Sequence, residues 1–313
     1  MTAVVSSSAM MRFRRAWNFF WCRQASPHAL AVFRIGFGAF QLLYWGLRLS
    51  HVAMLYSRDG ILLPLFPPNV LFGIFAPPAA VARAILCVLL FAIFFLTIGY
   101  RARLAAAIAF LLYVYYWCLS LYQLGSSFDR IFLFIFFVLA CSGCDRAFSL
   151  SMYLRHGSFW AWEKVSILPQ RLLAIQITAT YLGVGWQKLL LPDWQSGTVI
   201  SYGFVGRWAT PLARPIALWN LPFWVFDWLN TIIKCFELTL PFGLWHRRTR
   251  LWYMAGGFVF HTMITLLLGI WWFEVLIPAY VVFFSPEETL LFLRRLSGGR
   301  IPAEPAQTLV SAV

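Results

Sequence analysis

Long apolar segments joined by short polar connections are the feature that most constrains this chain. A helix needs about 20 apolar residues to cross the hydrocarbon core of a bilayer, and most of the segments come close to that length. At 61% hydrophobic and 12% charged residues, the composition excludes an ordinary soluble domain. We therefore predict an all-α fold, a polytopic membrane bundle of about eight transmembrane helices. The predicted spans are 30–47, 79–98, 104–121, 128–141, 172–190, 221–245, 251–269 and 271–284, of which the fourth and eighth are short.

The basic residues predict the orientation of these spans. Lys and Arg collect in cytoplasmic connections of membrane proteins, and here they alternate strongly between the two sides. One side carries Arg12, Arg14, Arg15, Arg23, Arg101, Arg103, Arg146, Arg155, Lys164, Arg171, Arg247, Arg248, Arg250, Arg294, Arg295 and Arg300. The other carries Arg48, Arg58, Arg130, Arg207 and Arg214. Both termini are therefore predicted to be cytoplasmic.

The net charge of +14 does not indicate a nucleic-acid partner, because no separate basic domain or nucleic-acid motif accompanies it. The bilayer is the expected partner. No cleavable signal peptide is recognised at the start, and the absence of a targeting segment favours a bacterial plasma membrane. We predict a cytoplasmic N-terminal segment over 1–29, one membrane domain over 30–290, and a disordered cytoplasmic tail over 291–313.

The cysteines give a weak signal. Cys141 and Cys144 have the C-x-x-C spacing found in redox and metal sites, but no second Cys or His pair with metal-site spacing lies nearby. We interpret them as reduced thiols at a helix end and predict no metal site.

Ionisable residues inside predicted spans are few, and such residues usually face the bundle interior and pair with one another. Arg34, near the start of the first span, is predicted to snorkel toward the cytoplasmic headgroups, with a buried partner as the alternative. Lys234 and Glu237 lie three residues apart and share a helix face, so they form an internal ion pair or Glu237 belongs to a site. His261, near mid-membrane, either bonds a neighbouring helix or takes part in a site.

Lys188 stands near the outer end of the fifth predicted span. Pro192 stops the helix there, and Asp193 and Trp194 begin an outer connection. A charge at a helix centre costs about 2.5–3.5 kcal/mol on insertion scales and less near an interface. Three interpretations remain: a lysine that snorkels to the interface, a member of a structural ion pair, or a desolvated neutral amine that accepts a proton.

The stretch YLGVGWQKLLLPDWQSGTVISYGF around Lys188 resembles the signature of the vitamin K-dependent gamma-carboxylase superfamily, whose bacterial members carry the horizontally transferred transmembrane (HTTM) domain. In that family a helix ends in an A/G-G-x-x-K-L pattern, followed by D-W, a glycine and an aromatic-rich stretch. Further stretches match in the same order along the chain. They are FRIGFGAFQLLYWGLRL, YSRDGILLP, IGYRARLAA, CDRAFSLSMYL and FVFHTMI, so the resemblance covers about residues 34–284.

The resemblance implies a chemistry. In the carboxylases the matching lysine is the weak base that deprotonates vitamin K hydroquinone, and oxygen then converts the quinol into a strong base. That base removes a γ-proton from a substrate glutamate, which takes up CO2. Lys188 and His261 are then the candidate catalytic residues and a quinone is the candidate cofactor. The candidate binding residues are Asp59, Asp129, Asp193, Trp194 and Glu237.

Two departures from the carboxylases leave an alternative open. The carboxylases carry a histidine at the start of span four, where this chain reads LGSSFDRIF with Ser127 or Asp129 in its place. They also carry a large luminal domain after the membrane part, whereas this sequence ends soon after its last predicted span. The alternative is a non-enzymatic membrane partner in maturation, export or transport of a secreted peptide, of the sporulation-delaying protein B type.

Overall fold

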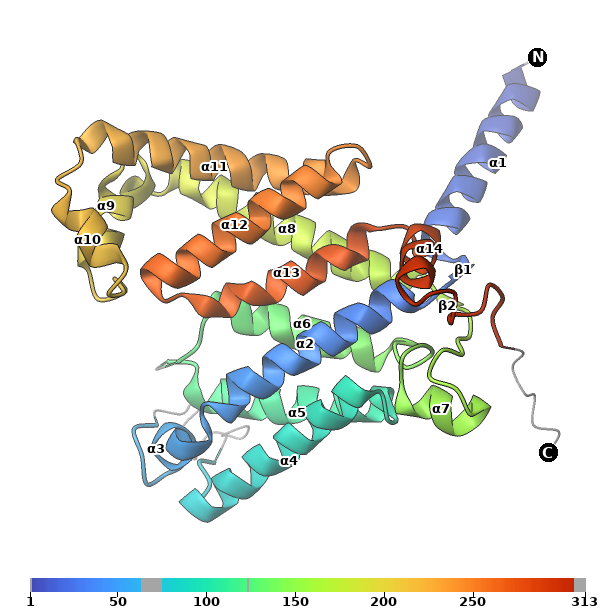
Figure 1. Ribbon diagram of the computed structural model, residues 1–313, viewed down its shortest axis with the longest axis horizontal. Helices are drawn as coiled ribbons and strands as arrows, with labels where there is room; N and C mark the ends of the chain where they lie inside the picture. The colour runs from blue at the N-terminus through green and yellow to red at the C-terminus, as the bar shows by residue number, and fades with distance from the viewer. Residues whose placement is uncertain (1, 63–74, 123, 307–313) are drawn as a thin grey trace. The chain divides into compact units, whose positions relative to one another are not determined.

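The computed structural model describes residues 2–62, 75–122 and 124–306, with side chains described from Met10 onward. Most of these residues are helical, and there is one two-stranded sheet, as Figure 1 shows. The predicted all-α class is confirmed for this part of the chain. By contacts the chain divides into two compact units, one over 1–173 with 284–313 and one over 174–283.

The first unit is built on four long neighbouring helices. They are α2 (His28–Gly46), α4 (Ala79–Ile98), α5 (Ala102–Ser120) and α6 (Ser127–Ala140). The shorter elements are η1 (Leu49–His51), α3 (Val52–Tyr56) and α7 (Leu150–His156). Helices α1 (Thr2–Trp21) and α14 (Pro286–Leu296) belong to the same unit, and β1 (Gln24–Ala25) pairs antiparallel with β2 (Val165–Ser166).

Consecutive long helices of this unit run antiparallel, and residues predicted to share a membrane side meet at the same end. The backbone N–H of Arg101 donates to Ser151 Oγ at the end where α4 finishes. At the opposite end, Asp59 Oδ2 accepts from the N–H of Ala79, the first residue of α4. The contacts therefore agree with the alternation of connections that the basic residues predict.

The second unit contains α8, α11 and α12. Helix α8 (Leu168–Leu190) begins in the first unit, and η2 (Pro192–Trp194), α9 (Thr198–Val205) and α10 (Ala213–Leu218) follow it. Helices α11 (Phe223–Trp245) and α12 (Arg250–Leu268) pack on each other, and the chain then forms η3 (Trp271–Val275), α13 (Leu276–Ala279) and η4 (Tyr280–Phe283).

The predicted count of eight spans is not confirmed. Among the described residues, four helical stretches are long and apolar enough to cross a membrane, and a bent pair, Trp271–Phe283 with Pro286–Leu296, would make a fifth. The four are His28–Tyr56, Ala79–Ile98, Ala102–Ser120 and Arg250–Leu268. Helix α6 has only 14 residues, and polar residues reduce the mean hydropathy of α8 and α11. Each remaining predicted span nevertheless coincides with helix.

The prediction that Arg34 snorkels is wrong. Its side chain is fully buried, and its guanidinium donates to the carbonyl oxygens of Cys144 (3.0 Å) and Phe148 (2.6 Å) in the connection after α6. A Cβ on Gly99 would lie 2.3 Å from Arg34 Nη1, and Gly99 has a φ of +73°. The buried alternative is therefore the one observed, because backbone carbonyls with no helical partner bind the charge.

The tail is ordered further than predicted. Helix α14 extends to Leu296, and Ile301 is fully buried against Ala31, Ala147 and Trp162. Trp162 Nε1 donates to the carbonyl oxygen of Pro302 at 3.0 Å. The expectation of disorder is therefore wrong for 291–306, because Ile301 is buried in the core of the first unit. Residues 307–313 lie outside the described residues.

The CSGC pair is split between two environments. Cys141 is exposed and Cys144 is fully buried, and both are free thiols. Burial raises the pKa of the Cys144 thiol to about 11, although the charge of Arg34 acts in the opposite direction. A protonated buried thiol is a poor nucleophile and metal ligand, in agreement with the interpretation of reduced packing thiols.

Candidate functional site

Lys188 and Glu237 form a buried ion pair within the second unit. Lys188 Nζ donates to Oε1 and Oε2 of Glu237, each at 2.6 Å. The two side chains are only 12% and 6% exposed. The ammonium also lies 4.2 Å from the ring centroid of Trp194, within the range of a cation–π contact. Lys188 therefore has two partners inside the unit, and the interpretation of a snorkelling lysine does not hold.

A close approach of two helices brings the pair together. Gly185, one turn before Lys188, faces α11, where a Cβ at its position would lie 2.9 Å from two side-chain carbons of Leu238. Leu238 follows Glu237 directly. The small residue therefore allows α8 and α11 to pack closely where the two charges meet, which gives the glycine of the G-x-x-K pattern a physical role.

The turn after α8 is fixed by residues of α11. Trp194, in η2, presents a carbonyl oxygen that accepts from Asn230 Nδ2 and from Lys234 Nζ, both at 2.9 Å. The N–H of Gly197 donates to Asp227 Oδ1 at 2.7 Å. Of the two alternatives for Glu237, the ion pair with Lys234 is not the one observed. Glu237 pairs with Lys188 on α8, and Lys234 donates to the backbone of Trp194.

A second polar group lies nearby. The hydroxyl of Tyr181 is 2.6 Å from His261 Nε2 and 2.8 Å from the hydroxyl of Tyr280, and all three side chains are buried. Gly257, one turn before His261 on α12, makes room for this arrangement, since a Cβ there would lie 2.2 Å from Tyr280 Oη. Helices α8 and α12 and the segment η4 each contribute one member.

The two groups share one side of α8. Tyr181 and Lys188 are seven residues apart, two helical turns or about 10.5 Å along the axis. Lys188 and His261 are close enough to interact electrostatically, and so are Tyr181 and Glu237. His261 Nδ1 is buried and has no hydrogen-bond partner among the described residues. A buried nitrogen without a partner is costly, so this atom is a natural contact for a ligand.

Asp129 lies in the first unit, where its contacts stabilise the start of α6. With Ser126 it forms a capping box at the start of α6, where Asp129 Oδ2 accepts from the N–H of Ser126 at 2.7 Å. Its Oδ1 accepts from the hydroxyls of Tyr113 (2.6 Å) and Tyr44 (3.3 Å). Asp129 and Lys188 belong to different units of the chain.

The other candidate acids are exposed. Asp59 accepts from the N–H of Ala79 and so caps α4 from a neighbouring segment, in a loop motif whose last two residues, 63 and 64, lie outside the described residues. Asp193 lies in η2 with no hydrogen bond to any described residue. Of the candidate residues, the structure brings together Lys188, Glu237, Trp194 and, on the same side of α8, His261.

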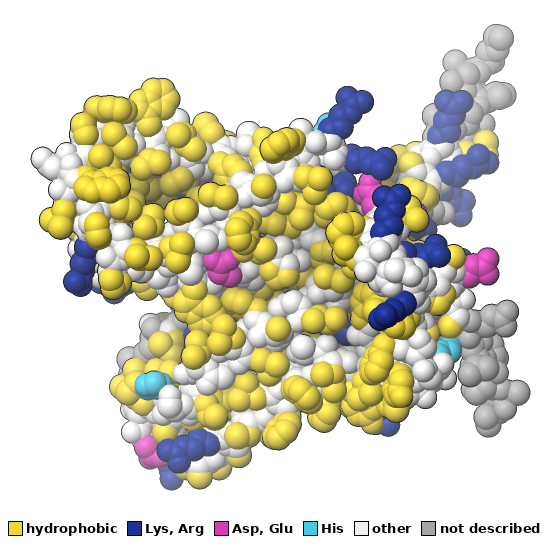
Figure 2. Space-filling view, viewed as in Figure 1, with side chains coloured by type: hydrophobic (Ala, Val, Ile, Leu, Met, Phe, Trp, Pro, Cys, Tyr) yellow, Lys and Arg dark blue, Asp and Glu magenta, His cyan; other side chains and the backbone are white. Residues whose placement is uncertain are grey.

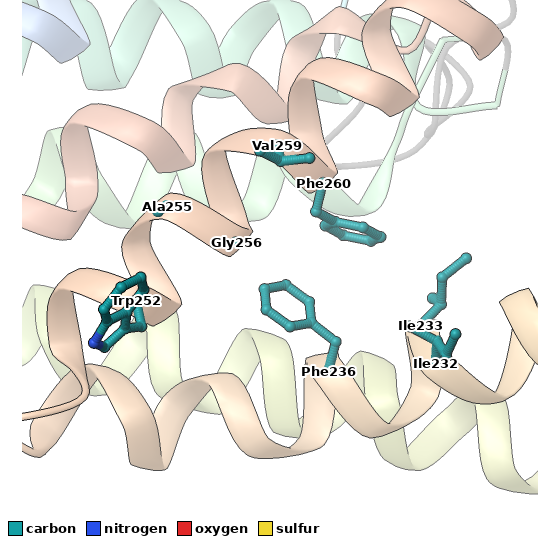
Figure 3. Close-up of a pocket in the computed structure, with 8 residues that line it drawn as sticks. All are labelled: Ile232, Ile233, Phe236, Trp252, Ala255, Gly256, Val259 and Phe260. Carbon is teal, nitrogen blue, oxygen red and sulfur yellow. The ribbon is translucent and has the colours of Figure 1, made fainter.

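An apolar groove runs between α11 and α12 (Figure 3). It measures about 460 Å³ and is lined by Ile232, Ile233, Phe236, Trp252, Ala255, Gly256, Val259 and Phe260. Phe236 directly precedes Glu237 and Phe260 directly precedes His261, and the centroids of the two rings are 5.6 Å apart. Both helices therefore present apolar residues to the groove beside residues of the polar groups.

Sequence reasoning missed Tyr181 and Tyr280. In a chain with 12 tyrosines and 16 tryptophans, both resemble interfacial aromatic residues. The available signal was the spacing of Tyr181 from Lys188, which places them on one side of the helix. No comparable spacing points to Tyr280, which reaches the group only through the packing at Gly257.

The comparisons agree with the fold. The model of the HTTM domain matches residues 22–288. Searches of the curated proteins and of the solved structures found no match. The family match covers most of the chain, including the ion pair, the tyrosine–histidine group and the helices apolar enough to cross a membrane. The chain therefore belongs to the HTTM domain family and is a membrane protein related to the vitamin K-dependent gamma-carboxylases.

Proposed function

We propose that the chain is a quinone-using, carboxylase-like membrane enzyme in which Lys188 and Glu237 together accept a proton from a hydroquinone. The observation that carries the proposal is the buried pair itself, with both Nζ–O distances at 2.6 Å. Both side chains are almost excluded from water. Ionisable groups buried in this way are typical of functional sites.

The pair is neutral in two forms. It exists as ammonium and carboxylate, or as amine and carboxylic acid after one proton moves along a hydrogen bond. In either form it takes up one further proton, which leaves an ammonium and a carboxylic acid. The proton-accepting atom is Lys188 Nζ in one case and a Glu237 oxygen in the other, so the two residues form a single base.

His261 is proposed to orient the substrate oxygen. If Tyr280 donates to Tyr181 and Tyr181 donates to His261 Nε2, the proton of the imidazole is on Nδ1, the atom that has no partner among the described residues. Nδ1 then donates a hydrogen bond to a ligand oxygen, and the two tyrosines fix the tautomer and the ring.

These residues fit a phenolic ligand. The pair supplies an acceptor, His261 Nδ1 supplies a donor, and Trp194 supplies an aromatic face. A bound hydroquinone would supply an ionisable hydroxyl and reducing equivalents. Gly185 and Gly257 set the helix spacing that holds the acceptor and the donor in place.

The second candidate is a non-enzymatic membrane partner in maturation or export of a secreted peptide. One observation favours it. Nζ of Lys188 donates to both oxygens of Glu237, so each charge is compensated without a ligand, as in a structural ion pair. In that case Lys188, Glu237 and His261 serve packing alone, and no quinone binds.

Quinone retention separates the two candidates. The full chain is purified in detergent and extracted into organic solvent, and the extract is assayed for quinone by mass spectrometry. The expected result is bound quinone in the wild type and its loss in the double variant Lys188→Ala/Glu237→Gln, which removes both charges without leaving one buried. Lys164→Gln is the control, because it removes the charge of an exposed lysine in the first unit that takes no part in the proposed site. Absence of quinone from the wild type, or equal retention in all three proteins, would contradict the proposal.

A further inference from the structure

Helix α14 (Pro286–Leu296) has two different faces. Pro286 and Thr289 are buried, and Leu290 and Leu293 pack against the core cluster of Ala31, Ala147, Trp162 and Ile301. These four positions recur at intervals of three and four residues, as expected for the buried side of a helix. One face of α14 is therefore fully used in fixing the helix to the first unit.

The opposite face is apolar and exposed. Leu291, Phe292 and Leu296 are 55%, 61% and 69% exposed, and Arg295 lies among them. Because the other face of α14 already packs on the core, this second apolar face does not serve packing within the unit. Contiguous exposed apolar residues of this kind mark a surface that binds a partner or a membrane. Large apolar side chains interspersed with arginine are the composition of helices that lie in a membrane interface.

The position of α14 suits an interface. Ser26 Oγ donates to the carbonyl oxygen of Pro286, and Arg23 pairs with Glu287, so α14 sits at the N-terminal end of α2. Helix α2 belongs to a stretch apolar enough to span a membrane. In Figure 1 α14 is viewed almost end-on whereas α2 runs across the view, so α14 lies crosswise at the end of the span. A crosswise helix at the end of a span lies in the plane of the headgroups.

The charges on α14 are separated, with both acids in the first turn and both arginines in the last. Of its two carboxylates, Glu287 is paired with Arg23 and Glu288 accepts from the N–H of Ser285 in a capping box. Arg294 and Arg295 form no ion pair with a carboxylate of the described residues, although Arg294 Nε donates to a backbone carbonyl. Figure 2 shows Lys and Arg side chains gathered where α14 lies. The C-terminal turn of α14 therefore presents two positive charges that an anion can bind.

We infer that the exposed face of α14, formed by Leu291, Phe292, Arg295 and Leu296 with Arg294 at its edge, is an interfacial surface that binds anionic phospholipid headgroups. The apolar side chains enter the boundary between headgroups and acyl chains, and the two arginines bind phosphate. An acidic protein partner would satisfy the arginines but leave Phe292 and Leu296 without an apolar environment at the end of a span, so the observations favour the lipid.

Hydrogen–deuterium exchange of the backbone over 286–296 tests the inference. The full chain is placed in nanodiscs of phosphatidylcholine alone or of phosphatidylcholine mixed with phosphatidylglycerol. We expect slower exchange over 286–296 in the anionic discs. Each arginine should contribute a factor of roughly five to the slowing of exchange in the anionic discs. The double variant Arg294→Gln/Arg295→Gln should lose both factors. Phe292→Gln should reduce protection in both kinds of disc. Arg207→Gln, an exposed arginine outside α14, is the control and should change nothing.

Three results would overturn the inference. They are equal exchange over 286–296 in the two kinds of disc, protection by soluble inorganic phosphate that equals protection by phosphatidylglycerol, and protection that appears only when an acidic peptide is added. Unchanged exchange in α2 and α4 verifies that each variant is folded.

Discussion

Lys188 and Glu237 each depend on the other, because both side chains are almost completely removed from water. Removing one partner leaves a buried charge without compensation, whereas replacing both by apolar residues of similar size is often neutral. The ion pair is therefore a weak contributor to stability as a unit and a severe liability when broken.

We predict that Lys188→Ala lowers the free energy of unfolding by about 3–5 kcal/mol, while Lys188→Met/Glu237→Leu lies close to the wild type. The measurement is thermal unfolding of the purified proteins in one detergent. Equal destabilisation by the single and the double variant would show that packing at these positions, not charge compensation, stabilises the unit.

The residues found from the sequence are those whose chemistry is unusual for their location. Lys188, Glu237 and His261 are ionisable groups in apolar segments, and that alone marks them. The partners of the ionisable residues were not predictable from local spacing, which suggested Lys234 for Glu237 and the headgroups for Arg34. In the structure, Glu237 pairs with Lys188, and Arg34 donates to the carbonyls of Cys144 and Phe148. These partners lie far away in the sequence.

At the scale of elements, two glycines of α8 that are two residues apart have opposite environments. Gly185 is buried against Leu238 of α11, whereas a Cβ on Gly183 would contact nothing within 4 Å. Close packing of α8 and α11 therefore depends on one glycine and not on the other.

We predict that Gly185→Ala destabilises the chain by about 1–3 kcal/mol through overpacking at Leu238. Gly183→Ala should be neutral or stabilise it by up to about 1 kcal/mol, because alanine favours the helix. Thermal unfolding of the two variants in the same detergent measures the difference. If both substitutions have the same effect, the close approach of α8 and α11 is not what Gly185 provides.

The connection between α7 and β2 is held by one acid. Glu163 accepts from Arg146, Arg155 and His156 and its side chain is 7% exposed. Burial acts to raise the pKa of the Glu163 carboxyl, but the hydrogen bond with His156 and the charges of Arg146 and Arg155 outweigh burial and lower it below its ordinary value of 4.5. The carboxylate therefore stabilises the fold above about pH 4.5, and this contribution is lost as the pH falls through the lowered pKa.

We predict that Glu163→Gln lowers the melting temperature at neutral pH and flattens its decline below about pH 4.5. Melting temperatures of wild type and variant across the acidic range provide the measurement, with Glu304→Gln as a control at an exposed position that forms no ion pair among the described residues. Parallel declines in wild type and Glu163→Gln would contradict the role assigned to Glu163.

At the scale of the whole molecule, the hydropathy pattern predicted where helices lie better than which of them cross the membrane. The predicted 79–98 coincides with α4, and 172–190 lies within α8. Sequence alone does not distinguish a spanning helix from an apolar helix that packs inside the protein. Helix α6 is an example, because its 14 residues are mostly apolar but fewer than the roughly 20 that a span requires. The crosswise helix α14 was missed because its short amphipathic pattern crosses the boundary between the predicted membrane domain, 30–290, and the predicted tail, 291–313.

We predict that both termini are cytoplasmic and that the connection after α10 is not. Green fluorescent protein fused to either terminus should fluoresce in a bacterial host, and alkaline phosphatase fused after Trp219 should be active, whereas the same enzyme fused after Arg248 should be inactive. An active phosphatase at Arg248 would invert the predicted orientation.

The central claim is that Lys188 and Glu237 act together as a base, and the rate of hydroquinone oxidation tests it most directly. The assay compares proteoliposomes containing wild type, Lys188→Met/Glu237→Leu or Lys164→Gln, with a soluble hydroquinone and oxygen. The account predicts oxidation by the wild type and the Lys164 control and a loss of about 10²–10⁴-fold in the double variant, the usual contribution of a general base. Equal rates in all three proteins, including no oxidation by any of them, would contradict it.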